Sequence, residues 1–276
     1  MRVGFIGLGS QGGPMARRII DAGFATTLWA RRSASLDPYA DTAAATADSP
    51  AALAAASDLV CVCVVGDDDV REVVTGENGL LAGMKPDTTL AVHSTVHPDT
   101  CRDLATLAAR QGVSVLDAPV SGGGPAATEG RLLVMVGGPS AAVEFARPVL
   151  ATYADPIVHL GDVGAGQCAK LLNNLLFTAN LATAQGTLRL GAELGLDIGR
   201  LGEVITHGTA DSFALGRVVA SGGTLDGLAA RAGDLLRKDV GLLAELAAAA
   251  HAAPGIELRA ADAALAVMNR ERTARR

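Results

Sequence analysis

The chain contains 276 residues, enough for two modest domains, and its 49% hydrophobic and 19% charged content is ordinary for a folded globular protein. A formal net charge of −6 argues against a nucleic-acid-binding protein, which would usually present a basic surface. Since no apolar run approaches the ~20 residues of a membrane-spanning helix, we expect neither a nucleic-acid nor a membrane partner.

The N-terminal part alternates short apolar runs with helical stretches, the pattern of a parallel β-sheet covered by helices on both faces. The expected strands are Val3–Ile6, Thr26–Trp29, Leu59–Val65, Thr89–His93, Val113–Leu116, Leu132–Val136 and Ile157–His159. The expected helices between them are Gly12–Ala22, Pro50–Ala56, Asp68–Val74, Thr100–Arg110 and Ser140–Leu150. This part is therefore predicted to be an α/β domain over residues 1–164.

The alternation stops after Leu160, and the remaining sequence reads as helices. The stretch Gln167–Leu194 contains no proline and predicts one long helix, apolar nearly all round, which favours burial against other helices or another subunit. Further helices are expected at Ile198–Thr206, Ser212–Val219, Ala229–His251 and Pro254–Asn269. We therefore predict a second, all-α domain over residues 165–276, joined to the first by the long helix.

A glycine-rich segment follows the first strand directly and opens the first helix: Gly7-Leu8-Gly9-Ser10-Gln11-Gly12. The first glycine permits a tight turn, the second lets the backbone approach a pyrophosphate, and the third allows close packing of helix and strand. The N-terminus of the helix then offers N–H groups to the anion. A glycine-rich turn without chemical meaning would not explain this spacing, so we predict a Rossmann domain that binds a dinucleotide.

The end of the second strand indicates which dinucleotide. A site that prefers NAD usually places an acidic residue here to bind the ribose diol, whereas this chain has Ala30, Arg31 and Arg32. Guanidinium groups suit the 2′-phosphate of NADP. We therefore expect NADP rather than NAD, the alternative being that either arginine stacks on the adenine or lies in solvent.

Cysteine and histidine usage points away from metal chemistry. Cys61 and Cys63 would face the same side of a strand, which is not a metal or redox spacing, and this favours buried structural thiols in a reducing, cytoplasmic compartment. The five histidines form no ligand motif, and Asp67-Asp68-Asp69 reads as a solvated helix start. No metal is expected.

Four stretches, in this order along the chain, resemble the β-hydroxyacid dehydrogenase family: GFIGLGSQGGPMA (4–16), DAPVSGG (117–123), GDVGAGQCAKLLNN (161–174) and LRKDVGL (236–242). The family includes 3-hydroxyisobutyrate dehydrogenase, tartronate semialdehyde reductase and the glyoxylate/succinic semialdehyde reductases. The resemblance spans nearly the whole chain. It implies an enzyme of hydride transfer to or from a small carboxylate-bearing substrate, assembled as a homodimer or homotetramer.

The resemblance also assigns roles to individual residues. It implies that Lys170 is the catalytic lysine and that Asn174 is its neighbour in the substrate site. It also implies that Lys238 reaches the cofactor or the active site from the helical domain, with Asp239 close by. It implies further that the substrate carboxylate binds at Ser121, Gly122 and Gly123. The segments that would border the cofactor are Val65-Gly66 and Ser94-Thr95.

The chain departs from the family pattern at three places. Gly66 replaces a proline that many members have, which would loosen a cofactor loop, and Ala30 replaces the acidic residue of NAD-using members. The Gly-x-Gly-x-x-Asp-x-Ser-Ala segment that many members carry at their C-terminus does not occur here, so the resemblance defines no C-terminal edge for the substrate pocket.

Carbonyl reduction needs a hydride and a proton, and Lys170 can donate the proton or accept it in the reverse reaction. Asn174 lies four residues later, so both side chains would project from one helix face, and Gly164-Ala165-Gly166 would allow close approach of the cofactor and a hinge. Apolar neighbours argue against an ordinary surface lysine. An imine reductase would share the fold but usually lacks this lysine. An inactive Rossmann module, serving as a sensor or interaction platform, would have no need of Lys170 or Ser121.

Overall fold

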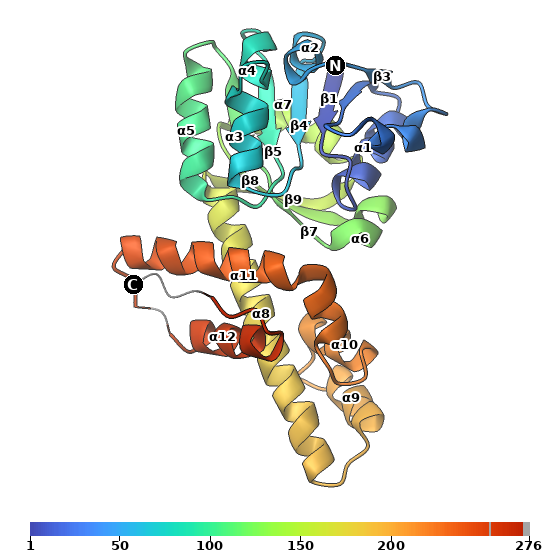
Figure 1. Cartoon of the computed structure of the whole chain (residues 1–276), viewed down its shortest axis with the longest axis vertical. Coiled ribbons are helices and arrows are strands. Elements are labelled where there is room, and N and C mark those ends of the chain that lie inside the picture. Colours follow the sequence, from blue (N-terminus) through green and yellow to red (C-terminus); the bar gives the residue numbers. More distant parts are fainter. Residues whose placement is uncertain (254, 273–276) are drawn as a thin grey trace. The chain divides into compact units, whose positions relative to one another are not determined.

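The computed structural model describes residues 1–253 and 255–272, and the chain divides into two compact units, Met1–Lys170 and Leu171–Arg276. Figure 1 shows a sheet with flanking helices in the first unit and helices in the second. The division falls inside one long helix, whereas the sequence placed it at the start of that helix, after Gly164.

The first unit contains a nine-stranded sheet within the described residues. Its strands are β1 (Arg2–Ile6), β2 (Ala25–Trp29), β3 (Ala45–Thr46), β4 (Leu59–Val62), β5 (Thr89–Val92), β6 (Ser114–Asp117), β7 (Val120–Ser121), β8 (Leu132–Gly137) and β9 (Ala154–Gly161). The strand order is β3-β2-β1-β4-β5-β6-β8-β7, and β9 pairs with β8. Strands β1 to β6 pair in parallel, with Phe5 opposite Leu28 on one side and Cys61 on the other.

The predicted Rossmann architecture is confirmed, with one correction to the sheet. The alternation predicted a parallel sheet throughout, but β8 runs antiparallel to both β6 and β7. Two neighbouring strands that run in parallel must be joined by a crossover of about a dozen or more residues, usually an α-helix. Between β6 and β8 the chain instead forms the two-residue β7 and a short helix, α6 (Gly123–Glu129), so β8 returns beside β6 in the opposite direction.

Helices cover both faces of the sheet because its strands are apolar on both sides. In β4, Leu59 and Cys61 belong to one core and Val60 and Val62 to the other, as expected for residues that alternate across a strand. The first core includes α1 (Gly12–Asp21) and α7 (Ser140–Leu150). The second includes α2 (Pro50–Ala55), α3 (Asp67–Thr75), α4 (Leu80–Gly83) and α5 (Pro98–Ala109). Two short 3₁₀ helices, Ser33–Ser35 and Asp37–Tyr39, follow β2.

Several boundaries differ from the predicted ones for local reasons. The strand predicted as Leu59–Val65 ends at Val62, because the Val64 N–H donates to the Ser94 hydroxyl and not to a neighbouring strand (2.9 Å). The helix predicted as Thr100–Arg110, with Pro98 or Asp99 as its opening residue, begins at Pro98, and His97 caps it by accepting a hydrogen bond from the Asp99 N–H (3.2 Å). The sequence did not predict β3, β7, α4 or α6, since two- to seven-residue elements contain too little periodicity to detect.

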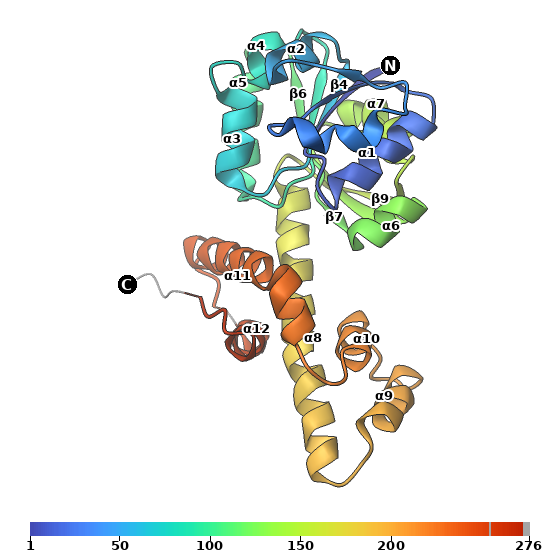
Figure 2. The ribbon, with the colours of Figure 1, turned by 45° about the vertical axis from the view of Figure 1, so that its right-hand side comes forward.

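The second unit is built on α8 (Ala165–Glu193), which begins in the first unit (Figure 2). The other helices are α9 (Ile198–Thr206), α10 (Phe213–Ala220), α11 (Asp226–Ala249) and α12 (Ile256–Val267). Leucines and alanines of α8, α10, α11 and α12 form its core. After Gly161 every regular element of the described residues is a helix, as predicted. The predicted start of the last helix, Pro254, lies outside the described residues.

Burial keeps two cysteines and one histidine of the first unit neutral. Burial raises the pKa of the Cys61 and Cys63 thiols to about 12 and lowers the pKa of His93 to about 4. His93 contacts the Ala118 carbonyl (2.7 Å) and the Tyr153 hydroxyl (3.1 Å) through its two ring nitrogens. These groups belong to the core.

The described residues contain neither a helix suited to a membrane nor a side-chain cluster suited to a metal ion. None of the helices there combines the length and the apolar character needed to cross a membrane. Over residues 1–253 and 255–272, no cluster of three or more histidine, cysteine and acidic side chains is arranged to hold a metal ion.

Candidate active site

The segments predicted to bind the cofactor lie at one edge of the sheet. Gly7–Gly12 follows β1, Arg31-Arg32 follows β2, Val65-Gly66 follows β4, and Thr95 follows β5. These four strands are parallel neighbours in the order β2-β1-β4-β5, so their carboxyl ends meet at the same edge. In open α/β sheets this edge binds the ligand, next to the point where the strand order reverses.

The glycines after β1 fit a dinucleotide. Gly7 has a φ of +99°, and a Cβ there would collide with the Cys63 carbonyl. A Cβ on Gly12 would collide with the Gly7 carbonyl, whereas one on Gly9 would meet nothing within 4 Å. Gly7 and Gly12 are therefore required by the chain's own packing. Gly9 leaves open space at the N-terminus of α1, as close approach of a pyrophosphate requires.

The two arginines after β2 are both exposed, but Arg31 is paired with two carboxylates. Its Nη2 donates to the Asp69 carboxylate (2.9 Å) and to the Glu72 carboxylate (3.1 Å), both on α3. The sequence did not reveal this pairing. Arg31 lies 38 and 41 residues from its partners, and only the three-dimensional arrangement of β2 and α3 brings them together.

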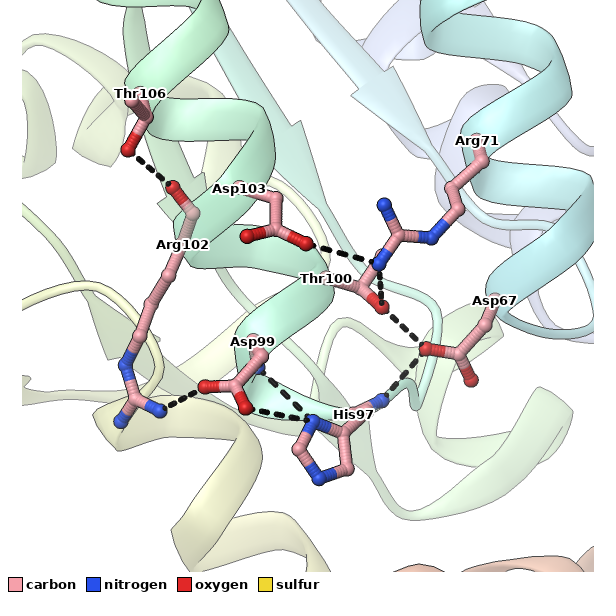
Figure 3. Close-up of polar contacts among 8 residues, drawn as sticks. All are labelled: Asp67, Arg71, His97, Asp99, Thr100, Arg102, Asp103 and Thr106. Atoms are coloured by element: carbon pink, nitrogen blue, oxygen red, sulfur yellow. Dashed lines mark hydrogen bonds and ion pairs between the residues drawn. The ribbon is translucent and has the colours of Figure 1, made fainter.

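The loops after β4 and β5 are joined on both sides of Val65-Gly66. Ahead of it, the Val64 N–H donates to Ser94. Behind it, one oxygen of Asp67 accepts from the His97 N–H (2.9 Å) and the Thr100 hydroxyl (2.6 Å), as Figure 3 shows. Asp67 is therefore more than the solvated helix start that the sequence suggested, and it ties together the two loops expected to border the cofactor.

The predicted substrate loop starts beside the glycine-rich segment after β1, which is predicted to bind the pyrophosphate. Ser121 ends β7, and the exposed Gly122 and Gly123 both have positive φ values, +127° and +74°. A Cβ on Gly124 would lie 2.7 Å from the Ser10 carbonyl oxygen. The first turn of α6 thus lies directly against the loop after β1, so the two segments share one edge of the first unit.

The first turn of α8 is fixed to the sheet by Asp117, the last residue of β6. One oxygen of this fully buried carboxylate accepts from the Gly164 N–H and the other from the Gln167 N–H, each at 2.7 Å. Burial raises the pKa of Asp117, and the backbone N–H groups oppose that rise by stabilising the anion. Lys170 follows three residues later and is half-buried.

The Gln167 side chain adds a second attachment. Its amide nitrogen donates to the Ser94 carbonyl (2.8 Å), and its oxygen accepts from the Val96 N–H (3.1 Å), so α8 is bonded to the loop that contains Thr95. Sequence reasoning gave no role to Asp117 or Gln167. One signal was present in the sequence. Each is a polar residue beside an apolar run, Asp117 at the end of a strand and Gln167 near the start of a helix.

The glycines ahead of Lys170 are explained by close packing. Gly164 has a φ of +98°, and a Cβ there would lie 2.9 Å from Nε of Arg102. Arg102 is itself held by Asp99 on α5 (2.6 Å; Figure 3). A Cβ on Gly166 would collide with the Met135 carbonyl. Gly164 and Gly166, in the segment expected to act as a hinge, are thus buried and closely packed within the first unit.

The second unit brings Asn174, Lys238 and Asp239 together. The Asn174 amide donates to one oxygen of the buried Asp239 carboxylate (2.6 Å), and Lys238 Nζ lies 3.1 Å from the other. Asn173 donates to the Asn174 side-chain oxygen (3.1 Å). Because a carboxylate only accepts hydrogen bonds, the NH2 group of Asn174 must face Asp239, and this fixes the orientation of the amide. Asn174 lies one helical turn after Lys170 on α8.

Comparison with known proteins covers both units. Residues 2–161 match the family described as the NAD binding domain of 6-phosphogluconate dehydrogenase, and residues 164–275 match the NAD-binding domain of NADP-dependent 3-hydroxyisobutyrate dehydrogenase. The 3-hydroxyisobutyrate dehydrogenase of Pseudomonas aeruginosa is 35% identical over 250 residues, which cover 87% of this chain and 83% of the relative.

Two further proteins extend the comparison. The 2-(hydroxymethyl)glutarate dehydrogenase of Eubacterium barkeri is 34% identical over 249 residues, which cover 89% of this chain and 82% of the relative. The structure of a Mycobacterium tuberculosis 3-hydroxyisobutyrate dehydrogenase with L-serine matches 98% of this chain and 99% of its own, with a TM-score of 0.84 and 28% identity.

Proposed function

This chain belongs to the β-hydroxyacid dehydrogenase family and is an NAD(P)-dependent hydroxyacid dehydrogenase, and from that premise we propose an NADP-dependent enzyme with Lys170 as its general acid and base. The proposed substrate is a small β-hydroxy acid or the corresponding semialdehyde. One observation carries the proposal: the helix with Lys170 is bonded through Asp117 and Gln167 to the same sheet edge that holds the cofactor segments.

The cofactor, when bound, supplies or accepts the hydride, and a side chain of the protein must donate or accept the proton. In the oxidation direction Lys170 takes the proton of the substrate hydroxyl while the carbon loses hydride; in reduction it returns the proton to the carbonyl oxygen. A half-buried lysine can reach a small substrate while its apolar neighbours limit the access of water. The rigid start of α8 fixes the position of this proton donor.

Asn174 is proposed to orient the reacting oxygen. Its side chain is nine-tenths buried and bonded to Asp239, so the amide has little rotational freedom. An amide held in this way can hydrogen-bond a substrate oxygen without taking part in proton transfer. Lys238, beside Asp239, balances the negative charge of the buried carboxylate.

The substrate carboxylate is proposed to bind at Ser121, Gly122 and Gly123. The relatives are named for 3-hydroxyisobutyrate and 2-(hydroxymethyl)glutarate, both of which are hydroxy acids. A hydroxyl and exposed glycine backbone at the end of β7 suit an anion, and the absence of side chains at two adjacent positions leaves it access.

A substrate panel tests this function. 3-Hydroxyisobutyrate, 2-(hydroxymethyl)glutarate, L-serine and L-threonate would be assayed by nicotinamide absorbance with NADP and with NAD. We expect at least one acid to be oxidised, and its methyl ester to lose most of the kcat/KM because the carboxylate contact is gone. A cyclic imine with NADPH serves as the contrasting substrate. Reduction of the imine without turnover of any acid, or no turnover at all, would refute the proposal.

We further propose that the enzyme is a homodimer or homotetramer in the cytoplasm. Leu172, Leu176 and Leu190 of α8 are 56%, 58% and 55% exposed, which is unusual for leucines on one long helix and favours a partner subunit. The four free cysteines suit a reducing compartment.

Light scattering at micromolar concentration should therefore give at least a dimer. Leu190→Glu should shift the distribution toward smaller species, whereas Leu107→Glu, at an exposed leucine of α5, should not. A strictly monomeric wild type would contradict the proposed assembly.

A further inference from the structure

An ion-pair bridge crosses the edge of the sheet where the cofactor segments meet. Arg31 follows β2, and its partners Asp69 and Glu72 lie in α3, which follows β4. Strands β2 and β4 flank β1 on opposite sides. The bridge therefore joins the two elements on either side of the glycine-rich segment after β1.

The same guanidinium group is the one proposed to contact the 2′-phosphate of NADP. In the structure its Nη2 is already shared by two carboxylates. A phosphate that approaches this group must displace at least one of them or bind beside both, and it meets their negative charge in either case. A dinucleotide without the 2′-phosphate brings no such charge.

We propose that Asp69 and Glu72 are specificity-determining residues that compete with the 2′-phosphate for Arg31 and so limit the preference for NADP over NAD. The inference rests on the proposed contact between Arg31 and the phosphate. By this inference, the strength of the preference for NADP depends on Asp69 and Glu72 of α3 as well as on the two arginines. Surface ion pairs of this kind are weakened by salt, so the NADPH preference depends on ionic strength.

The test is a gain of function, which misfolding cannot mimic. Asp69→Asn/Glu72→Gln keeps the size of both side chains and removes their charges. An exposed ion pair contributes at most about a factor of five, so two pairs limit NADPH use by up to about thirty-fold. We expect kcat/KM for NADPH to rise by more than about twofold and by up to about thirty-fold at low salt, and kcat/KM for NADH to stay within about twofold.

A matched control removes two carboxylates from arginine ion pairs elsewhere in the first unit. Asp41→Asn/Glu144→Gln changes the net charge equally by releasing Arg17 and Arg147, and it should leave the ratio of the two cofactors unchanged. If the control raises NADPH use as much as the test variant, the effect is one of overall charge, and the inference fails.

The remaining outcomes also decide the matter. Unchanged or weaker NADPH use in Asp69→Asn/Glu72→Gln would overturn the inference, the weaker result meaning that the acids orient Arg31 for the phosphate. A selective loss with NADH would equally overturn it, by placing a carboxylate on the ribose. Arg31→Ala distinguishes a failure of the proposed phosphate contact from a failure of the inference about α3. If Arg31→Ala leaves NADPH use intact, the phosphate contact itself is wrong. If it lowers NADPH use while Asp69→Asn/Glu72→Gln gains nothing, only the inference is wrong.

Discussion

Lys170→Ala should lower kcat by at least ~10²-fold, the low end of what a positioned acid–base group supplies. Binding of NADPH should survive nearly unchanged, because the predicted pyrophosphate and ribose contacts lie at Gly7–Gly12 and Arg31. The first turn of α8 would keep its bonds to Asp117, so the variant should fold. Steady-state kinetics in both directions, with cofactor affinity followed by nicotinamide fluorescence, measures the split between kcat and binding.

Three variants sharpen this result. Lys170→Arg should not restore the rate, since a guanidinium stays protonated and cannot act as the base. Asn174→Ala should fall between wild type and Lys170→Ala, because it loses orientation but keeps the proton donor. Lys85→Ala removes another lysine of the first unit, one bonded to the Ala55 carbonyl, and should leave kcat unchanged. Near-wild-type kcat in Lys170→Ala would make the mechanism wrong and favour an inactive Rossmann module.

Arg31→Ala/Arg32→Ala should erase most of a preference for NADPH. Both substitutions remove a charge-assisted bond to the phosphate, and the loss from Arg31 should be the smaller because this side chain must leave Asp69 and Glu72 to bind it. The double variant should therefore lose roughly 10- to 100-fold in kcat/KM for NADPH. The value for NADH should change little.

Arg147→Ala is a control for the loss of an exposed arginine, with half the charge change of the double variant. Arg147 pairs with Glu144 on α7, so its loss removes an exposed arginine of the first unit without touching the end of β2. A wild-type enzyme that prefers NADH by tenfold or more would contradict the assignment of NADP from Ala30-Arg31-Arg32.

Sequence reasoning succeeded where the signal was periodic or local. The strand–glycine–helix start at residues 3–22 and the long apolar helix after Gln167 both follow from patterns within one stretch of chain, and both were found. The reversal of β8 was missed because it depends on β7 and α6, which are too short to leave a pattern.

The candidate site shows the same limit at the level of side chains. The family motifs indicated Lys170, Asn174 and Asp239, but not that Asp117 holds the first turn of α8 or that Asp239 bonds to Asn174. Asp117 bonds to a backbone N–H 50 residues away, and Asp239 to an amide 65 residues away. Such pairs are set by the packing of whole elements, and a single sequence contains no record of which distant polar residues meet.

Because α8 is attached to β6, residues that hold this attachment also influence the geometry of the proposed active site. Lys170 shares one rigid frame with Asp117, because only a single helical turn separates the lysine from the two N–H groups that this carboxylate holds. The geometry of the proposed proton transfer would thus be set by the sheet of the first unit. Natural or engineered changes at Asp117 would therefore alter the proposed active site, although its carboxylate is fully buried and bonded to the main chain.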